Sequence, residues 1–408
     1  MSFARTVDEH REAALAAITP LAPVELPVAA ALGRTTATAV RARVDIPAFD
    51  NSAMDGYALR AVDGDMPRTV VADIAAGASG GAVLVEGEAA RIMTGAPLPA
   101  GADAIVPHER TAETFREVGV GSTVHLASVP EAGAHVRRRA DDVAAGDVVL
   151  EAGVRLGPRQ RAAVAAAGAA SVLVRPAPRV VVISSGDELV APGQPIGPGQ
   201  IPESNGILLD GAIREADGEV LATEIVDDTP AHLRALLERI ETDGAADLVI
   251  LTGGASVGAY EVVRDVLEPT GVEFLPVAMQ PGKPQGFGAL ASGIPVFCLP
   301  GNPVSVAVSF EVFVRPVLLR LQGRSDVTRP VLQLPAAVGW RTPPEREQYM
   351  PVAVDRSDPA RWTVRPATAG GSGSHRAGAL AHAEGWARVP AEKDRVDPGE
   401  LVDVMLVP

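Results

Sequence analysis

The chain has 408 residues, of which 47% are hydrophobic, 21% are charged and 3% are aromatic. This composition excludes a disordered chain, and the length exceeds what one hydrophobic core supports, so at least two domains are expected. The net charge of −15 argues against nucleic acid as a partner, because an acidic surface repels phosphate backbones.

The first residues lack a signal-peptide pattern, and no apolar run reaches the ~18 residues of a membrane span. The single cysteine, Cys298, permits no intrachain disulfide. These features predict a protein of the reducing cytoplasm, without a membrane partner.

The first predicted element is a helix near the N-terminus, where Thr6 and Glu9 form a capping-box pair. Residues 45–140 then predict a small all-β domain, because short β-type runs alternate with glycines. These runs are 69–74, 82–85, 89–93, 104–107 and 123–126. A second helix is predicted at 158–167 and a strand at 171–174. Since the two helices flank the β segment, we expect them to pack together in one discontinuous domain.

From residue 179 the pattern alternates between strands and helices, which predicts a parallel sheet with helices on both faces. The predicted strands are 180–184, 220–226, 248–251 and 296–299, and the predicted helices are 207–216, 230–240, 260–267 and 304–321. Beyond about residue 329, short strands and a Gly-rich turn at 370–373 predict a second small β domain.

Polar or Gly-rich segments follow all four predicted strands of the sheet. They read SGDE at 185–188, DDTP at 227–230, TGGASVG at 252–258 and PGNPVS at 300–305. Ligands of open α/β sheets bind at the carboxyl ends of the strands, and glycines there admit an anion close to the backbone. Acidic groups beside an anion are favourable mainly when a hard cation such as Mg²⁺ lies between them. The joint interpretation is a site for a phosphorylated ligand and a divalent ion, although each segment alone is more often a plain turn or helix start.

Two further stretches carry side chains suited to chemistry, FDNSAMDGYA at 49–58 and the Pro-flanked Lys283. From spacing alone, Asp55 is more often a turn residue before Gly56, and Lys283 is more often an ordinary solvated lysine. The seven histidines show no HxH or HExxH pairing, so we assign them no metal role.

Seven motifs are spread in order along nearly the whole chain. They are DIPAFDNSAMDGYA at 45–58, IMTGAP at 92–97, SGDEL at 185–189, SNG at 204–206, GGASVG at 253–258, PGKP at 281–284 and LPGNPVS at 299–305. In content and spacing they resemble the MoeA-type molybdopterin molybdenumtransferases, a family that includes the gephyrin E domain.

The resemblance implies a multi-domain α/β fold and an elongated homodimer, with the active site between the α/β domain of one subunit and the N-terminal part of the other. The implied domains are a discontinuous linker at 1–45 and 141–177, a β insert at 46–140, a MogA-like doubly wound α/β domain at 178–328 and a C-terminal β domain at 329–408. The implied reaction converts adenylyl-molybdopterin and molybdate into molybdenum cofactor and AMP in the presence of Mg²⁺. The implied partners are an upstream MogA-type adenylyltransferase and recipient molybdoenzymes.

Site residues are also implied by this resemblance. The catalytic residues would be Asp55, Glu188, Asp227 and Glu261, of which Asp227 and Glu261 would hold Mg²⁺. The substrate-binding residues would be Thr94, Arg137, Asp142, Ser185, Gly253, Gly254, Ser256, Lys283, Asn302, Ser305 and Ser374.

Several positions depart from the family pattern. Glu261 stands where the family has aspartate, which moves the carboxylate by about 1.5 Å, and the motif VRxxGED reads VRRRADD at 136–142. Two positions that are basic in the family are Pro276 and Gln280, which leaves Lys283 as the cation of that loop. These departures keep open an alternative, a paralogue that carries or scaffolds the pterin without inserting metal. A MogA-type adenylyltransferase fits less well, because the N-terminal motifs and flanking β domains lie outside that simpler fold.

Overall fold

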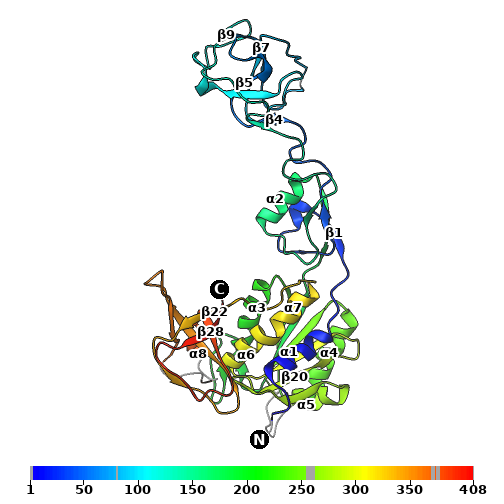
Figure 1. Cartoon of the computed structure of the whole chain (residues 1–408). Helices are drawn as coiled ribbons and strands as arrows, with labels where there is room; N and C mark the ends of the chain where they lie inside the picture. The colour runs from blue at the N-terminus through cyan, green and yellow to red at the C-terminus, as the bar shows by residue number, and fades with distance from the viewer. Residues whose placement is uncertain (1–2, 80, 254–261, 369–372, 374–376, 408) are drawn as a thin grey trace.

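The computed structural model describes residues 3–79, 81–253, 262–368, 373 and 377–407. The described chain is elongated and has three tiers (Figure 1). A small β domain forms the tip, a smaller unit containing α2 and β1 forms the middle, and the α/β domain with the C-terminal β domain forms the base. None of the helices in these ranges has the length and apolarity needed to cross a membrane.

The tip is a five-stranded sheet in the order β8-β5-β7-β6-β9. Its strands are β5 (Gly56–Leu59), β6 (Arg68–Ile74), β7 (Glu88–Ile92), β8 (Ala104–Pro107) and β9 (Thr123–Val124). Strand β5, between β8 and β7, is buried on both faces, so Tyr57 and Leu59 contribute to one small core and Ala58 to another. The strand predicted at 82–85 is wrong, because only an isolated bridge forms there, between Val83 and Ala100.

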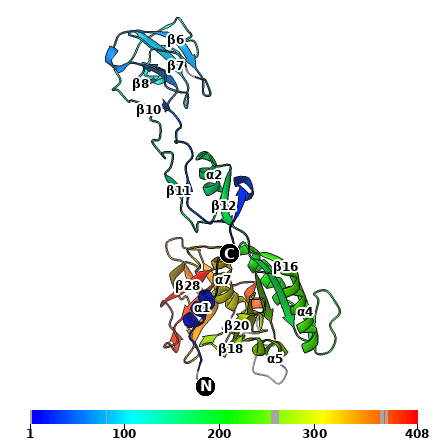
Figure 2. The ribbon, with the colours of Figure 1, turned by 90° about the vertical axis from the view of Figure 1, so that its right-hand side faces the viewer.

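Short antiparallel pairs connect the tip to the middle tier (Figure 2). Their strands are β4 (Asn51–Ser52) with β10 (Val136–Arg137), and β3 (Val40–Arg41) with β11 (Val148–Leu150). The middle tier contains β1 (Val24–Pro27), β2 (Thr35–Thr36), β12 (Ser171–Arg175) and α2 (Pro158–Ala166). Val28, Leu156, Val164 and Val174 form its core.

Helix α1 (Val7–Ala16) begins with the predicted capping box, in which the Glu9 N–H donates to Thr6 Oγ1 and the Thr6 N–H donates to Glu9. The expected packing of this helix against α2 is wrong. Val7, Ala14 and Ile18 are buried in the core of the α/β domain instead. An amphipathic pattern specifies which face of a helix is buried but not which surface covers it, so sequence order misled the prediction.

The α/β domain has a six-stranded sheet in the order β16-β13-β17-β21-β20-β18. The strands are β13 (Arg179–Ser185), β16 (Glu219–Val226), β17 (Leu248–Thr252), β18 (Glu273–Pro276), β20 (Pro284–Ala289) and β21 (Pro295–Leu299). The first four in the sheet order are parallel, as predicted, but β20 and β18 form an antiparallel edge that the alternation did not predict. Strand β20 reads PQGFGA, and its proline and glycines hide the usual strand signal.

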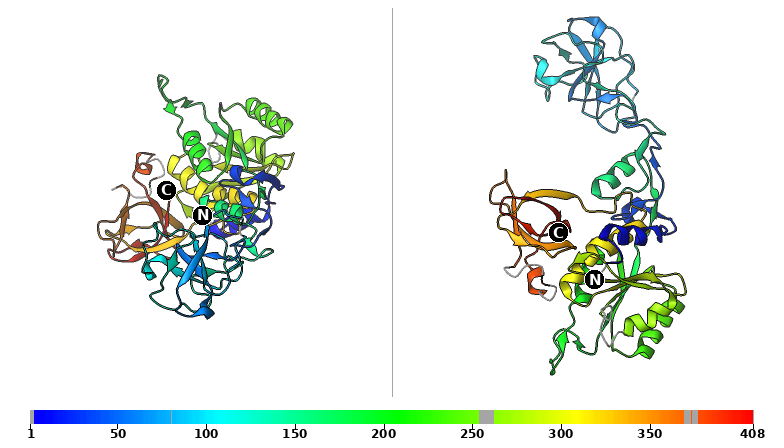
Figure 3. Two further views of the ribbon diagram at one scale, coloured as in Figure 1. Left: turned by 90° about the horizontal axis from the view of Figure 1, so that it is seen from above. Right: turned by 60° about the horizontal axis from the view of Figure 1, so that its bottom comes forward.

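Helices cover both faces of this sheet (Figure 3). They are α3 (Asn205–Glu215), α4 (Pro230–Asp243), α5 (Val262–Leu267), α6 (Pro303–Ser309) and α7 (Arg315–Leu321). The long helix predicted at 304–321 is continuous but contains a π-helical turn at Phe310–Val314. Pro316 follows this turn and lacks the N–H that a regular α-helix would use there.

The C-terminal domain is a mixed sheet in the order β19-β24-β26-β28-β22, with β25 on β24. Its elements are β22 (Val331–Pro335), β23 (Trp340–Arg341), β24 (Glu347–Asp355), β25 (Thr363–Pro366), α8 (Ala377–Leu380), β26 (Gly385–Val389), β27 (Arg395–Val396) and β28 (Leu401–Leu406). The edge strand β19 (Met279–Gln280) comes from a loop of the α/β domain. The two domains of the base therefore share one sheet.

Candidate active site

The carboxyl ends of β13, β17 and β21 open into a cavity of about 420 Å³, which we call the strand-end cavity. A small two-stranded flap, β14 (Leu189–Val190) with β15 (Ile201–Pro202), forms another wall. The residues that line the cavity include Ser185, Glu188, Asn205, Asp228, Gly253 and Asn302. The predicted convergence of these strand ends is therefore correct for Ser185, Glu188, Gly253 and Asn302.

Gly253 is required by the geometry at the end of β17. Its φ of +94° is one that side chains disfavour, and a Cβ at this position would lie 2.2 Å from the carbonyl oxygen of Ser185. The next strand end also approaches closely, since a Cβ on Gly301 would lie 3.4 Å from the Gly253 Cα. Because these backbone segments pack so closely, the part of the cavity wall that they form can move little.

Asn205 joins three elements around the cavity and was not singled out from the sequence. Its Nδ2 donates to Thr252 Oγ1 at 3.0 Å and to the carbonyl oxygen of Gly301 at 2.7 Å. Its Oδ1 is buried and accepts no hydrogen bond from the described part of the chain. The SNG motif was the available signal, but nothing in the pattern indicated that its asparagine would line the cavity.

The acidic residues at the strand ends have different surroundings. Asp228 lines the strand-end cavity and accepts a hydrogen bond from Ser185 Oγ at 3.1 Å, and its N–H donates to Asp187 at 3.0 Å. Asp227 is exposed beside the cavity and contacts His232 Nδ1 at 2.8 Å. That hydrogen bond is the main cause of a lowered pKa for Asp227. The family resemblance implied Asp227 as a metal ligand together with Glu261, and the structure shows Asp228 as an aspartate that lines the cavity.

A bound Mg²⁺ is compatible with these donors. No group of three or more His, Cys, Asp or Glu side chains suited to a metal occurs within the described ranges. Mg²⁺ does not require such a group, because it is usually held by one or two carboxylates together with waters and substrate phosphates. Three predicted site residues that follow Gly253 in the sequence, Gly254, Ser256 and Glu261, lie outside the described residues, as does Ser374.

A second cavity of about 330 Å³ adjoins the first and shares Gly301 and Asn302 with it. We call it the cationic cavity, because Lys283 and Arg346 both line it, together with the buried Ser305. Lys283 and Ser305 were predicted. Arg346 was missed, because it belongs to the C-terminal domain and reaches the site only through the pairing of β19 with β24.

The remaining predicted residues lie in the tip or where the tip joins the middle tier. Asp55 is exposed and accepts hydrogen bonds from the Thr94 N–H at 2.7 Å and from Thr94 Oγ1 at 2.8 Å. These bonds, first that from the backbone N–H, lower the pKa of Asp55. Arg137 lies in β10 beside Asn51, and the Asp142 N–H donates to the carbonyl of Ile46. Within one chain, the tip and the α/β domain, which carries the strand-end cavity, lie at opposite ends of the molecule (Figure 1).

Comparisons with known proteins cover nearly the whole chain. Residues 5–168 match the model of the MoeA N-terminal region (domain I and II), residues 181–320 match a probable molybdopterin binding domain, and residues 333–407 match the MoeA C-terminal region (domain IV).

Relatives and a solved structure agree with these matches. The molybdopterin molybdenumtransferase 2 of Mycobacterium tuberculosis is 41% identical over 98% of this chain and 99% of its own. Molybdopterin molybdenumtransferase 1 of the same organism is 35% identical over 98% of each chain. The crystal structure of a molybdopterin biosynthesis MoeA protein from Pyrococcus horikosii has a TM-score of 0.82 and 31% identity, covering 98% of both chains. The chain therefore belongs to the MoeA family.

Proposed function

We propose that this chain is a molybdopterin molybdenumtransferase of molybdenum cofactor biosynthesis. It would take adenylyl-molybdopterin and molybdate and release AMP with the finished cofactor. The names of relatives that match over almost their whole length support the transferase assignment. The observation that carries the proposal is the pair of adjoining cavities, one at the strand ends and one lined by cations, with Gly301 and Asn302 as their common wall.

The strand-end cavity would hold the adenylated pterin. Its glycines permit a phosphate to approach the backbone. The oxygen of the Ser185 hydroxyl, whose proton goes to Asp228, and Asn205 Oδ1, which accepts no hydrogen bond from the described residues, offer acceptors. Mg²⁺ would be held by Asp227 and Glu261, as the family resemblance implies, with Asp228 as an additional ligand that lines the cavity. Bound there, it would neutralise pyrophosphate charge.

The cationic cavity would hold molybdate, a tetrahedral dianion. Lys283 supplies a point charge, and Arg346 supplies a guanidinium that suits oxyanions. Pro276 and Gln280 carry no positive charge, although their positions are basic in the family. Arg346, from the C-terminal domain, would supply a cation at the wall of the cationic cavity in their place.

A homodimer would complete the site. In this proposal, the exposed Asp55–Thr94 pair of one subunit would face the strand-end cavity of its partner, because the tip of the same chain is too far away. We also retain the cytoplasmic location, the four domain limits and the enzymes named above as partners. The separate cores of the tip, middle and base support these limits. The exception is α1, which falls within the linker limits but packs in the core of the α/β domain, so we assign it to that domain.

The proposal is tested by incubating purified protein with adenylyl-molybdopterin, Mg²⁺ and molybdate. The expected result is molybdate-dependent AMP release and activation of an apo-molybdoenzyme. If neither product forms at saturating molybdate, the enzyme assignment is wrong.

The carrier or scaffold alternative rests on the two lost basic positions in the loop. It predicts tight binding of the adenylated pterin without AMP release in the same assay. The presence of Arg346 in the cationic cavity argues against it, because a carrier that does not handle molybdate has no use for a second cation there.

A further inference from the structure

The wall of the cationic cavity is built where three segments of the chain meet. Strand β19 pairs in parallel with the start of β24, with Met279 beside Glu347 and Gln280 beside Gln348. The Glu347 N–H also donates to the carbonyl of Ala278 at 2.9 Å. On its other side, this loop bonds to the N-terminal segment, since the Ala278 N–H donates to the carbonyl of Arg5 at 2.9 Å. The loop is thus held between the N-terminus and the C-terminal sheet.

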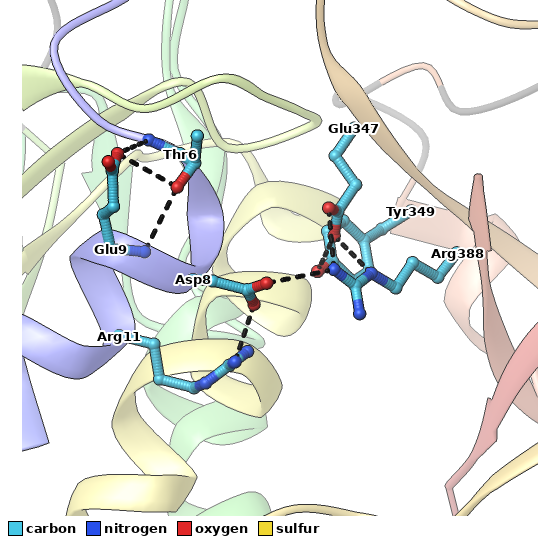
Figure 4. A network of polar contacts seen from close by, with 7 residues as sticks. All are labelled: Thr6, Asp8, Glu9, Arg11, Glu347, Tyr349 and Arg388. Atoms are coloured by element: carbon cyan, nitrogen blue, oxygen red, sulfur yellow. Dashed lines mark hydrogen bonds and ion pairs between the residues drawn. The ribbon is translucent and has the colours of Figure 1, made fainter. Parts of the chain in front are cut away.

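The residue that follows Arg346 is the centre of a polar network (Figure 4). The Glu347 carboxylate accepts hydrogen bonds from Arg388 Nε at 2.7 Å and Arg388 Nη2 at 3.0 Å, and from the hydroxyl of Tyr349. Arg388 Nη2 also lies 3.5 Å from Asp8 Oδ2 on α1, which itself pairs with Arg11 at 2.6 Å. We call the series Asp8, Arg388 and Glu347 the Arg388 bridge; it joins α1, β26 and β24.

The Arg388 bridge is half-buried, so solvent only partly screens the two hydrogen bonds that Arg388 donates to Glu347. The Glu347 side chain is only 16% exposed, and the hydrogen bond to Glu347 is the main cause of a raised pKa for Arg388. Without Arg388, the Glu347 carboxylate would keep the hydrogen bond from Tyr349 as its side-chain contact among the described residues, and it would be poorly hydrated. The first residues of β24 would then shift so that water reaches the carboxylate. Tyr349 and Trp386 are anchored in the core of the α/β domain, so the rest of the sheet would keep its place.

We propose that Arg388 is a positioning residue for oxyanion binding. By holding Glu347, it fixes the first residues of β24, and with them Arg346 and the paired strand β19 at the wall of the cationic cavity. The inference rests on the proposed function, because it assigns the cavity to molybdate. It predicts that loss of the bridge weakens binding of the oxyanion and spares the strand-end cavity, to which none of the three residues belongs.

The test compares Arg388→Gln with Arg356→Gln in the full-length protein. The control removes another Arg–Glu pair, that of Arg356 with Glu384, at the other end of the same two strands. For Arg388→Gln we expect the calorimetric Kd and the KM for molybdate to rise about tenfold, because a small displacement of a charged group weakens its contact steeply. The KM for adenylyl-molybdopterin should stay within about twofold of wild type. Arg356→Gln should change neither constant.

Further arms separate positioning from folding. Arg388→Lys should recover part of the molybdate affinity, since it restores charge but not the two-point contact. If Arg388→Gln does not fold, Asp8→Asn replaces it and should raise the molybdate Kd about twofold to threefold, because it removes only the more exposed end of the bridge. An unchanged molybdate Kd, or equal weakening of both substrates, would overturn the inference.

A second measurement does not depend on the function. Hydrogen exchange should accelerate in residues 279–284 and 346–350 of Arg388→Gln but not of Arg356→Gln. No difference between the variants would refute the positioning role. Failure of the wild-type protein to bind molybdate or release AMP is a separate result, which would refute the proposed function instead.

Discussion

The base of the molecule holds two adjoining cavities that share Gly301 and Asn302, whereas at the tip the Asp55–Thr94 pair lies exposed beside a small sheet. The base site is made largely by backbone, since Gly253 lies against the Ser185 carbonyl and Asn205 ties α3 to two strand ends. The tip site is made by one carboxylate and the residue that orients it. Both regions carry dense motifs, and the two cavities described above lie in the base.

The difference indicates two kinds of site in the function that we propose. A site made by backbone is complete when the domain folds, and substitution of its glycines should disrupt it most. A site made by an exposed side chain needs a second surface, which we propose is the partner subunit.

The largest expected effect is from Gly253→Ala. The substitution combines a φ of +94° with a Cβ only 2.2 Å from a carbonyl oxygen, so we expect a loss of about 3–5 kcal/mol in the free energy of unfolding. AMP release should fall at least ~100-fold, because the end of β17 must move. Urea unfolding and the AMP assay measure both effects.

Gly244→Ala is the matched control for that substitution. Gly244 also has a positive φ, of +59°, but its Cβ would meet nothing within 4 Å. We expect a loss of about 1 kcal/mol and ordinary activity. Equal losses at the two positions would show that the base is not built around the close approach.

The second experiment tests whether tip and base act from different chains. Asp55→Asn and Lys283→Ala should each lower AMP release by about 100-fold or more, the first by removing the charge that Thr94 orients. If each site combines the tip of one subunit with the base of the other, co-expression of the two variants gives mixed dimers with one intact site. About one quarter of wild-type activity should then return. No recovery in verified mixed dimers would place both residues in the same chain's site.

Much of the structure of the base could be predicted from sequence, because each feature is specified by residues that are close together in the chain. Buried parallel strands read as apolar runs, and the residues directly after them converge whatever the loops do. Ser185, Gly253 and Asn302 were therefore found at the strand-end cavity. The capping box of α1 was equally readable, since it is contained within four residues.

Features that depend on distant pairing were not predictable in this way. Arg346 lies in a polar stretch without a pattern, and it reaches the cationic cavity only because β19 joins the C-terminal sheet. The sequence placed both Asp227 and Asp228 near the anion site but did not indicate which of them lines the cavity, because adjacent residues differ only in the direction that the folded turn gives them. Sequence order also suggested the wrong partner for α1.

The third prediction concerns this helix and the acid stability of the base. His10 is 1% exposed and lies against Phe313, and its ring nitrogens have no hydrogen-bond partner among the described residues. Burial therefore lowers its pKa to about 4. Between its ordinary pKa near 6.5 and about 4, the unfolded chain binds a proton that the folded chain does not. The base should thus lose about 2–3 kcal/mol as the pH falls from 7 to 4.5.

His10→Met should remove this part of the acid sensitivity, while His382→Met, at an exposed position, should leave it unchanged. Urea unfolding at both pH values measures the difference. If wild type and His10→Met lose stability equally, the helix is not packed as a neutral part of the α/β core.

The smallest expected effect is at the joint between the middle tier and the base. Asp217 accepts hydrogen bonds from Arg155 Nε at 2.6 Å and Nη2 at 2.7 Å, and it also pairs with Arg324 of the base. Partial burial opposes ionisation of Asp217, but the two arginines outweigh it and hold its pKa below the usual value. Its contribution is therefore present above pH ~4 and disappears as the pH falls through the lowered pKa.

Asp217→Asn should cost about 1–2 kcal/mol at pH 7, because it leaves two half-buried arginines without their shared carboxylate. Asp210→Asn removes an exposed pair with Arg214 and should cost less than about 0.5 kcal/mol. Small-angle scattering should show a wider range of tip-to-base distances for Asp217→Asn alone. If the distances are unchanged, the close packing of Gly153 against Gly323 at the same joint orients the tip instead. The Asp55–Thr94 pair at the tip would then be as firmly placed as the cavities at the base.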